Sequence, residues 1–468
     1  MTDSDSAFDL TVIGSGPGGY VAAIRAAQLG MKTAVVEMAP RVGGTCLLWG
    51  CIPTKALLHA AEVLETSRHA GRFGVTTAPG EIDIPGLHKY KDKVVTSNVK
   101  GIEYLFKKGG ITMIPGRGRL AGPGKVAVAQ EDGAAKTLTT KFTVVATGSL
   151  IRGLPGVAFD GTQIINSDHA LSLKKIPASM IVLGAGAVGV EFASIYATFG
   201  AKVTIVELLP RLIPIEDASL GAELEKAFKK RGIGVHTGTK VERVVAGKGG
   251  VKVTASKDGQ AVELEAELLL VAVGRRPLTE DLGLEAASIK LDRGFVEVDE
   301  FMRTAAPGVY AIGDIVKTPA LAHVASHEGI VAAEHAAGAE PHPIDYDKIP
   351  SCTYCDPEVA SIGLTEEEAK KRGHDVVVGQ FPFSAIAKAK ILEDTRGFVK
   401  IVTDKKYDEV LGVHIIGAHA TELIAEATAA LNLEATAASL FQAVHAHPTL
   451  AEAMGEAALA VHGRAIHI

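Results

Sequence analysis

The chain has 468 residues, with 48 lysines and arginines against 54 aspartates and glutamates, which gives a formal net charge of −6. Its length corresponds to about three domain-sized units, and its balanced charge gives no basic stripe, so we exclude nucleic acid as a partner. Four cysteines are too few for a secreted disulfide scaffold, and the N-terminus lacks a signal core or transit sequence, so we expect a cytoplasmic protein. No apolar run approaches the ~20 residues that span a bilayer, so we expect no membrane attachment.

Residues 8–37 are predicted to form a strand, a glycine turn, a helix and a second strand. Gly14, Gly16 and Gly19 make a GxGxxG turn, and Glu37 ends the second strand. In such a turn the first glycine permits the tight bend, the second lets backbone amides approach a pyrophosphate, and the third lets the helix pack on the strand. The helix N-terminus adds partial positive charge, and Glu37 is placed to accept hydrogen bonds from a ribose. A lone GxGxxG is weak evidence, but here the strand, helix and acidic residue accompany it.

Two cysteines follow in the run GGTCLLWGCIPTK, at Cys46 and Cys51. A CxxxxC spacing by itself is more typical of structural cysteines. Its place after a dinucleotide turn favours a redox disulfide, because thiol–disulfide exchange needs one sulfur that a substrate thiol reaches and another that passes electrons onward. We predict that this pair, at a helix start, is a two-electron relay.

The strand–turn–helix–strand unit recurs at residues 178–207, with Gly184, Gly186, Gly189 and Glu207. The interval from first glycine to glutamate is 23 residues in both copies. Two matched copies in one chain indicate two bound dinucleotides. Because no arginine follows Glu207 until Arg211, the second site is expected to take NAD rather than NADP.

Further along, apolar strands at 141–149 and 266–277 are predicted to close the two nucleotide domains. Asp314 follows the apolar run of TAAPGVYAIGD, where its carboxylate can bind a ribose or polyol; capping of a turn explains it equally well by itself. Thr304 and Gly313 fit the same strand-and-turn context. From residue 347 onward, strands alternate with alanine-rich helices, which predicts a compact α+β unit without a nucleotide turn.

These motifs occur in one order along nearly the whole chain: first glycine turn, CxxxxC with Lys55, ATG, second glycine turn, GRRP, GVYAIGD and HxHPT. In wording and order they resemble the pyridine nucleotide–disulfide oxidoreductase family and, within it, the dihydrolipoamide dehydrogenase branch. The resemblance implies FAD at the first turn, NAD at the second, and a homodimer. We therefore expect an α/β fold with two Rossmann-like domains and a C-terminal α+β dimerisation domain. The expected boundaries are 1–150 for the FAD domain, 151–278 for the NAD domain, 279–346 for a segment returning to the FAD domain, and 347–468 for the interface domain.

The resemblance also implies separate roles for the residues of the redox centre. Cys46 would be the interchange thiol that meets lipoamide, and Cys51 the thiol in charge-transfer contact with the flavin. Lys55 would lie near the flavin, where its charge stabilises added electron density, and would pair with Glu191. Spacing alone would instead make Lys55 and Glu191 solvated helix residues.

Near the C-terminus, VHAHPTLAE places His445, His447 and Glu452 close together. A lone histidine is more often a packing residue than a base, but an acid five residues away can fix one imidazole tautomer. The resemblance implies that His447 is the base and that Glu452 orients it. The pair would act on the cysteines of the other subunit, and His445 would support the site. The nucleotide contacts that the resemblance implies are Gly14, Gly16, Gly19, Glu37, Lys55, Thr147, Gly148 and Asp314 for FAD, and Gly184, Gly186, Gly189, Glu207 and Gly274 for NAD.

Other suggestive residues have structural interpretations. Cys352 and Cys355 form a CxxC without accompanying ligands, so we interpret them as structural cysteines and predict no metal site. His323 and Glu328 resemble a segment that contacts the flavin in the family, but helix packing accounts for them equally well. Leu48, Trp49 and Leu278 depart from the family pattern without removing a proton-transfer or electron-transfer group.

The resulting hypothesis is a flavoprotein that oxidises a protein-bound dihydrolipoyl group and reduces NAD. Its expected partner is the lipoyl domain of a 2-oxo acid dehydrogenase or glycine-cleavage complex. One alternative is a related disulfide reductase with another thiol substrate. A second alternative is a flavoprotein binding module docked on a larger complex, although a scaffold needs none of the cysteines, His447 or Glu452.

Overall fold

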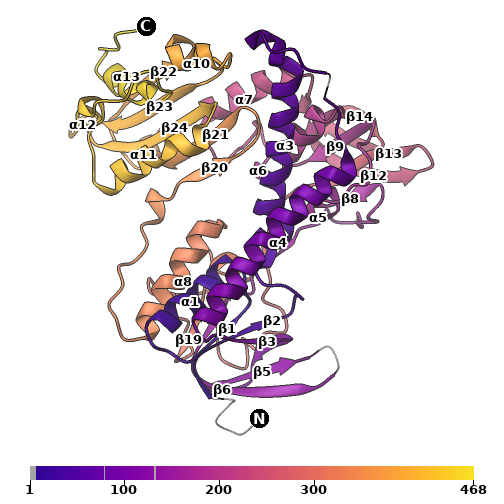
Figure 1. Ribbon diagram of the computed structural model, residues 1–468, viewed down its shortest axis with the longest axis vertical. Helices are drawn as coiled ribbons and strands as arrows, with labels where there is room; N and C mark the ends of the chain where they lie inside the picture. The colour runs from indigo at the N-terminus through magenta and orange to yellow at the C-terminus, as the bar shows by residue number, and fades with distance from the viewer. Residues whose placement is uncertain (1–6, 79, 131–132) are drawn as a thin grey trace. The chain divides into compact units, whose positions relative to one another are not determined.

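The computed structural model describes residues 7–78, 80–130 and 133–468, and Figure 1 shows its ribbon. The chain divides into two compact units, each assembled from three separate segments. The first unit comprises Met1–Ala56, His88–Arg152 and Arg275–Tyr346, and the second comprises Leu57–Leu87, Gly153–Gly274 and Asp347–Ile468. Within the described residues, no helix combines the length and the apolar character that a membrane crossing requires.

The first unit is built on a seven-stranded sheet of order β3-β2-β1-β6-β5-β4, with β19 also paired to β6. Strands β3, β2, β1, β6 and β19 are parallel to one another, whereas β5 pairs antiparallel with both β6 and β4. Strands β1 and β2 are almost completely buried, as parallel strands covered on two faces require. The strands of this unit are β1 (Ala7–Ile13), β2 (Thr33–Glu37), β3 (Thr112–Pro115), β4 (Arg117–Leu120), β5 (Lys125–Ala129), β6 (Ala135–Val145), β7 (Ser149–Ile151), β16 (Arg275–Pro277), β17 (Leu291–Asp292), β18 (Phe295–Val296) and β19 (Val309–Ala311).

Helices α1 (Pro17–Gln28) and α8 (Ala322–Ala336) pack against each other and share one apolar core with β1 (Figure 1). Helix α1 begins directly after the glycine turn, with Pro17 in its first turn, where the missing N–H costs nothing. Close packing depends on small residues: a Cβ on Gly329 of α8 would lie 2.5 Å from the carbonyl oxygen of Gly18. The other helices that carry residues of this unit are α2 (Gly44–Trp49), the start of α3 (Cys51–His69) and most of α4 (Ile84–Lys108).

The second unit contains a parallel sheet of order β11-β10-β9-β15-β8 and an antiparallel sheet of order β12-β13-β14. Helix α6 (Ala187–Thr198) follows β9 directly through the second glycine turn, so that β9, α6 and β10 repeat the arrangement of β1, α1 and β2. The remaining elements here are α5 (Ser167–Ala170), α7 (Ala218–Lys230), β8 (Ile164–Ile165), β9 (Ser179–Leu183), β10 (Lys202–Val206), β11 (Gly234–His236), β12 (Lys240–Gly247), β13 (Gly250–Lys257), β14 (Gln260–Ala266) and β15 (Leu268–Val271).

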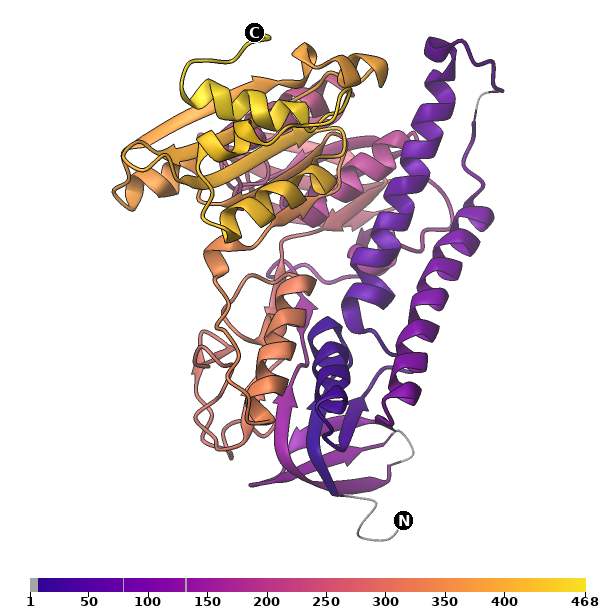
Figure 2. The ribbon, with the colours of Figure 1, turned by 60° about the vertical axis from the view of Figure 1, so that its left-hand side comes forward.

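The C-terminal part of the second unit is an antiparallel sheet of order β20-β21-β24-β23-β22. Helices α11 (Ala420–Asn432) and α13 (Glu452–Val461) cover one face of it, as Figure 2 shows, and α7 contacts β24. The sheet and its helices form the α+β unit expected from the sequence. Its other elements are β20 (Ser351–Thr353), β21 (Glu358–Gly363), β22 (Val376–Pro382), β23 (Phe398–Asp404), β24 (Val410–Gly417), α9 (Glu366–Lys371), α10 (Ala387–Ile391) and α12 (Ala437–Gln442).

A buried ion pair joins β23 to the start of α7. Lys400 is 5% exposed, and its Nζ lies 2.9 Å from Oδ1 of Asp217 and 2.7 Å from Oε2 of Glu366. Asp217 also caps α7 by accepting the N–H of Ser219 at 3.0 Å. Burial alone would raise the pKa of Asp217, but hydrogen bonds from Ser219 and Lys400 hold that pKa well below its usual range. The pair therefore stabilises the fold only while both partners are present.

We expect Lys400→Met to destabilise the protein by about 3–5 kcal/mol, because it leaves the Asp217 carboxylate buried without its cation. The measurement is the midpoint of urea unfolding at fixed protein concentration. Lys405→Met is the control, since Lys405 forms only an exposed 3.8 Å pair with Asp375, and such pairs contribute about 0–1 kcal/mol. Because the pKa of Asp217 is lowered in the folded protein, its ion pair contributes fully to stability above the unfolded pKa near 3.9. That contribution is lost as the pH falls through the folded pKa. The stability difference between wild type and Lys400→Met should therefore shrink only in acid. Equal midpoints for the two variants would contradict this assignment.

Candidate active site

The two cysteines of the CxxxxC motif come together where α2 passes into α3. Cys46 lies in α2 and Cys51 is the first residue of α3, with Gly50 between the helices. A hydrogen bond to the Cys51 side chain and burial raise the pKa of the Cys46 thiol, while the charge of Lys55 acts in the opposite direction. The structure therefore brings the two sulfurs and Lys55 together at one helix start, as thiol–disulfide exchange beside a fixed positive charge requires. Trp49, in the same segment, is 42% exposed.

Each glycine turn has two positions where the fold itself demands glycine. Gly14 has φ +103°, and a Cβ there would lie 2.4 Å from the carbonyl oxygen of Ala146; a Cβ on Gly19 would lie 2.0 Å from the oxygen of Gly14. The second turn repeats this geometry. Gly184 has φ +102°, and a Cβ there would lie 2.4 Å from the carbonyl oxygen of Ala272; a Cβ on Gly189 would lie 2.0 Å from the carbonyl oxygen of Gly184. These four positions permit the strand to approach its helix closely.

The middle glycine of each turn has a different role. A Cβ on Gly16 or Gly186 would meet no described protein atom within 4 Å, and each of these glycines is the N-cap of its helix. The space in front of each helix N-terminus is therefore open, and backbone N–H groups and the helix dipole favour an anion there. Both turns fit the pyrophosphate of a dinucleotide.

A buried glutamate follows each turn and is held by backbone N–H groups. Glu37 accepts the N–H of Ser15 at 2.7 Å through Oε2 and the N–H of Ala39 at 2.7 Å through Oε1. Glu207 repeats the geometry, with the N–H groups of Ala185 at 2.7 Å and Leu209 at 2.8 Å. These bonds orient each carboxylate, whose oxygens have further acceptor capacity for a ribose.

Arg211, the first arginine after Glu207, is engaged elsewhere. Its guanidinium lies 3.1 Å from Glu367 and donates to the carbonyl of Pro214 at 3.3 Å. Arg211 is therefore already engaged and is not available to bind the 2′-phosphate that distinguishes NADP from NAD. This favours NAD at the second turn.

The ATG segment and Ser149 after it form a polar cluster that the sequence does not predict. Thr147 donates to the carbonyl of Leu278 at 2.7 Å, and the N–H of Leu278 donates to Gly148 at 2.9 Å. The backbone of Leu278, not its unusual side chain, therefore makes this contact. Ser149 donates to Asp314 and accepts from Nε of Arg275 at 2.7 Å. Only the position of Ser149 directly after ATG could have signalled it, since its partners are distant in sequence.

Glu328 is engaged in hydrogen bonds within the first unit. This carboxyl is completely buried and accepts the N–H of Gly313 at 2.6 Å and the hydroxyl of Tyr346 at 3.0 Å. Burial raises the pKa of Glu328. Its bonds fix the turn that carries Asp314.

His447 and Glu452 form a hydrogen-bonded pair at the start of α13. Nδ1 of His447 lies 2.9 Å from Oε1 of Glu452, whose other oxygen accepts the N–H of Thr449 at 2.9 Å. Burial alone would raise the pKa of Glu452, but hydrogen bonds from His447 and Thr449 lower it. Because a carboxylate only accepts, Nδ1 carries the hydrogen and Nε2 is the basic nitrogen. The His447 side chain is 72% exposed, so a substrate can reach it.

The neighbouring histidine and the CxxC cysteines have structural contacts. Nε2 of His445 lies 2.8 Å from Glu426 of α11. The Cys355 thiol is buried and donates to the carbonyl of Pro357 at 3.2 Å, and burial raises its pKa well above the usual value. These properties make Cys355 a poor nucleophile. Across the residues that the structure describes, no three histidine, cysteine or acidic side chains are grouped to hold a metal ion.

Comparison with known protein families gives two matches. Residues 8–329 match the family described as pyridine nucleotide-disulphide oxidoreductase, and residues 349–458 match the dimerisation domain of that family. The chain belongs to the pyridine nucleotide-disulphide oxidoreductase family. The sequence-based prediction of this family is confirmed, and the dimerisation domain supports the expected homodimer.

Curated relatives and a solved structure agree with this membership. The chain is 46% identical to a dihydrolipoyl dehydrogenase of Bacillus subtilis and 45% identical to one of Zymomonas mobilis; each match covers 98% of this chain and 99% of the relative. The crystal structure of LpdA from Mycobacterium tuberculosis superposes with a TM-score of 0.89 at 30% identity, covering 96% of this chain and 99% of that one. The α/β fold class is confirmed. As a flavoprotein disulfide oxidoreductase of this family, the chain uses FAD and NAD.

We expect Gly186→Val to raise the KM for NAD at least about tenfold, equal to about 1.4 kcal/mol of binding free energy. The Cβ of the new side chain lies in the open space in front of α6, where no described protein atom is within 4 Å. Flavin content and the unfolding midpoint should stay at wild-type values. Gly249→Val, at another position where a Cβ meets no described atom within 4 Å, is the control. An unchanged KM in Gly186→Val would exclude the second turn as the NAD site.

Proposed function

We propose that this oxidoreductase is a dihydrolipoyl dehydrogenase, which oxidises a protein-bound dihydrolipoyl group to lipoyl and reduces NAD. The observation that carries the proposal is the combination, in one family member, of the hydrogen-bonded Cys46 and Cys51 thiols with the His447–Glu452 pair. The names of the curated relatives support the same activity. The proposed partner is a lipoyl domain of a 2-oxo acid dehydrogenase or glycine-cleavage complex, and the proposed compartment is the cytoplasm.

The first chemical step opens the oxidised Cys46–Cys51 disulfide. Nε2 of His447 removes the proton from one substrate thiol, and the resulting thiolate attacks Sγ of Cys46. A bond forms between the substrate sulfur and Cys46, the Cys46–Cys51 bond breaks, and Cys51 leaves as a thiolate. Glu452 stabilises the imidazolium that His447 becomes. In the homodimer, we assign His447 of one subunit to the cysteine pair of the other.

The second step releases the oxidised product. The remaining substrate thiol attacks the substrate sulfur that is bound to Cys46, which closes the lipoyl disulfide and breaks the bond to Cys46. Cys46 leaves as a thiolate and takes up the proton that the second substrate thiol gives up, while the first proton stays on His447. Two electrons have then moved from the substrate to the cysteine pair. The charge of Lys55, which lowers the cost of a nearby thiolate, supports the reduced pair.

The cofactors are assigned to the two glycine turns. FAD would be held by the first turn with Glu37, Thr147, Gly148 and Asp314, and NAD by the second turn with Glu207 and Gly274. FAD, when bound, would supply the two-electron and hydride-transfer chemistry that links the cysteine pair to NAD. We assign Lys55 and Glu191 to this cofactor as well, where preplaced charges would provide electrostatic stabilisation.

The test is a substrate panel with the purified, flavin-loaded homodimer. We expect NADH formation from dihydrolipoamide and NAD, with kcat/KM for NAD at least about a hundredfold above that for NADP. Parallel reactions contain reduced glutathione, a small monothiol, or a reduced dithiol protein in place of dihydrolipoamide. Turnover with one of these thiols alone would identify another disulfide reductase, and no turnover with any thiol would favour the binding-module alternative.

A further inference from the structure

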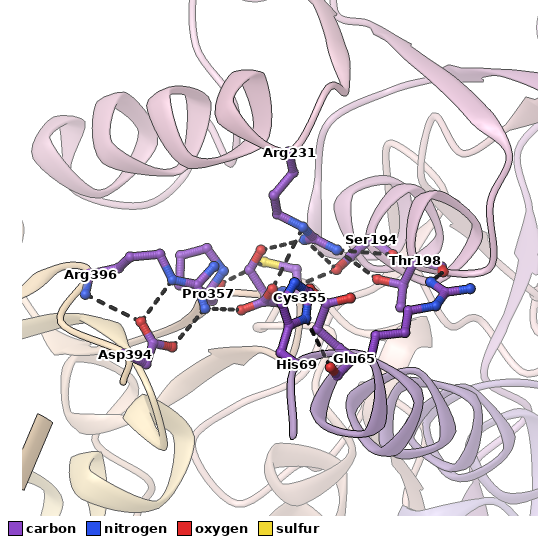
Figure 3. Close-up of polar contacts among 11 residues, drawn as sticks. Glu65, His69, Ser194, Thr198, Arg231, Cys355, Pro357, Asp394 and Arg396 are labelled. Carbon is purple, nitrogen blue, oxygen red and sulfur yellow. Dashed lines mark hydrogen bonds and ion pairs between the residues drawn. The ribbon is translucent and has the colours of Figure 1, made fainter. Parts of the chain in front are cut away.

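A loop of the C-terminal domain is fixed on one face of α6 by the polar network in Figure 3. Glu191, Ser194 and Thr198 are spaced along α6 so that they share this face. The loop is Tyr354–Pro357, which connects β20 to β21 and has no ladder bonds of its own to hold it. Its position therefore depends on side-chain contacts.

Arg231 makes the central contacts of this network. It lies at the C-terminal cap of α7, and its guanidinium donates to Oγ of Ser194 at 2.9 Å and to Oγ1 of Thr198 at 2.8 Å. The same group donates to the carbonyl of Asp356 at 2.5 Å, and its Nε lies 3.6 Å from the Asp356 carboxylate. One planar guanidinium thus binds α6 and the loop together, as Figure 3 shows.

Further contacts hold the loop from its other side. Arg396 lies 2.5 Å from Oδ1 of Asp356 and is itself oriented by Asp394, at 2.8 Å and 2.6 Å. The N–H of Asp356 donates to Ser194 at 3.1 Å. Cys355, the neighbouring loop residue, is 1% exposed and packs into the apolar core of the second unit. Arg231, Ser194 and Arg396 therefore hold Asp356 at the centre of the loop.

The loop then delivers one backbone donor to a buried carboxylate. Glu191 is 3% exposed, and its Oε1 accepts the N–H of Tyr354 at 2.9 Å. A shift of the loop by an ångström would break this bond, since hydrogen bonds of this type need 2.7–3.2 Å. The orientation of Glu191 is thereby coupled to contacts two residues further along the chain.

We propose that Arg231 is a positioning residue for Glu191: it fixes the Tyr354–Pro357 loop, whose Tyr354 N–H sets the direction of the Glu191 carboxylate. The inference rests on the role proposed above for Glu191 beside the flavin. Arg231 touches neither thiol nor nucleotide in this scheme; it acts through the loop. Lysine cannot replace it, because a point charge lacks the planar set of donors that reaches α6 and Asp356 at once.

The experiment compares Arg231→Met, Arg231→Lys and Glu191→Gln with the wild-type homodimer containing FAD. The readouts are the flavin reduction potential and the visible flavin spectrum, with thermal unfolding measured in parallel. Arg372→Met is the matched control, because Arg372 also caps a helix, α9, but forms exposed pairs with Asp347 and Glu368. A purely structural Arg231 would lower the unfolding temperature and leave the potential unchanged.

We expect both Arg231 variants to shift the potential in the same direction as Glu191→Gln, and Arg372→Met to leave it unchanged. The double variant Arg231→Met/Glu191→Gln should shift it no further than Glu191→Gln, because both changes act through one carboxylate. Asp356→Asn should give a smaller shift in the same direction and serves if Arg231→Met does not fold. A shift in Glu191→Gln without one in the Arg231 and Asp356 variants overturns the positioning role alone. No shift in Glu191→Gln overturns both this inference and the proposed role of Glu191.

Discussion

Cys46→Ser is expected to lower dihydrolipoamide-dependent NAD reduction by at least about a thousandfold, because serine cannot form the mixed disulfide that the proposed reaction requires. The substrate thiolate would have no disulfide to attack. FAD should remain bound, since the first glycine turn is untouched. Oxidation of NADH by an artificial dye should continue, because that reaction needs only the flavin and nucleotide sites.

The control for this variant is Cys352→Ser. Cys352 lies in β20, outside the CxxxxC motif, and its thiol makes only a long contact of 4.0 Å with the carbonyl of Thr421, so its loss as serine should cost little. We expect the lipoamide activity of Cys352→Ser to stay within about twofold of wild type, because a substitution outside the site and the buried core usually has a small effect. Lipoamide turnover that survives in Cys46→Ser would remove the cysteine pair from the mechanism.

The second large effect is expected at the His447–Glu452 pair. His447→Gln should lower kcat with dihydrolipoamide by about 10²–10⁴-fold, the contribution of a general base, while dye reduction by NADH stays at the wild-type rate. Glu452→Gln should cause a smaller loss, because the imidazole remains but loses the carboxylate that fixes its tautomer and stabilises its charged form. Stopped-flow reduction by dihydrolipoamide measures the affected step directly.

The lowered pKa of Glu452 predicts how the effect of Glu452→Gln on dihydrolipoamide activity depends on pH. A depressed carboxyl pKa means that Glu452 is fully ionised above the unfolded value near 4.3 and becomes protonated only as pH falls through the folded value. The advantage of wild type over Glu452→Gln should therefore be constant near neutral pH and shrink only in acid. His374→Gln is the control, because His374 also lies beside a carboxylate, Asp404 at 3.2 Å, but outside the proposed site. Equal losses in His374→Gln and His447→Gln would contradict the assignment.

Short-range patterns made much of this site predictable from the sequence. Gly14 and Gly184 need positive φ, and the glutamates that end β2 or follow β10 stand at a fixed interval, so spacing alone reveals both turns. Cys46 and Cys51 are separated by a single helix junction, and His447 and Glu452 by a single turn. In each case the partners are close along the chain, and local geometry determines their contact.

Contacts between distant segments could not be predicted in the same way. Ser149 meets Arg275 across 126 residues, and Lys400 meets Asp217 across 183. Neither pair has a periodic or motif signal, because only the packing of the strands and helices brings the partners together. Arg231 is a similar case: the sequence shows a basic residue after a helix, and only the fold reveals the loop that it holds. The domain boundaries proposed from the sequence stay a prediction.

The most direct test of the central claim is an anaerobic titration of the flavin-loaded protein with dihydrolipoamide, followed by absorbance, with NAD added afterwards. We expect a long-wavelength absorbance band from the Cys51 thiolate beside the oxidised flavin, followed by NADH absorbance once NAD is added. Flavin that stays unchanged with dihydrolipoamide but responds to another thiol would contradict the proposed substrate, and a flavin unresponsive to every thiol would contradict the relay itself.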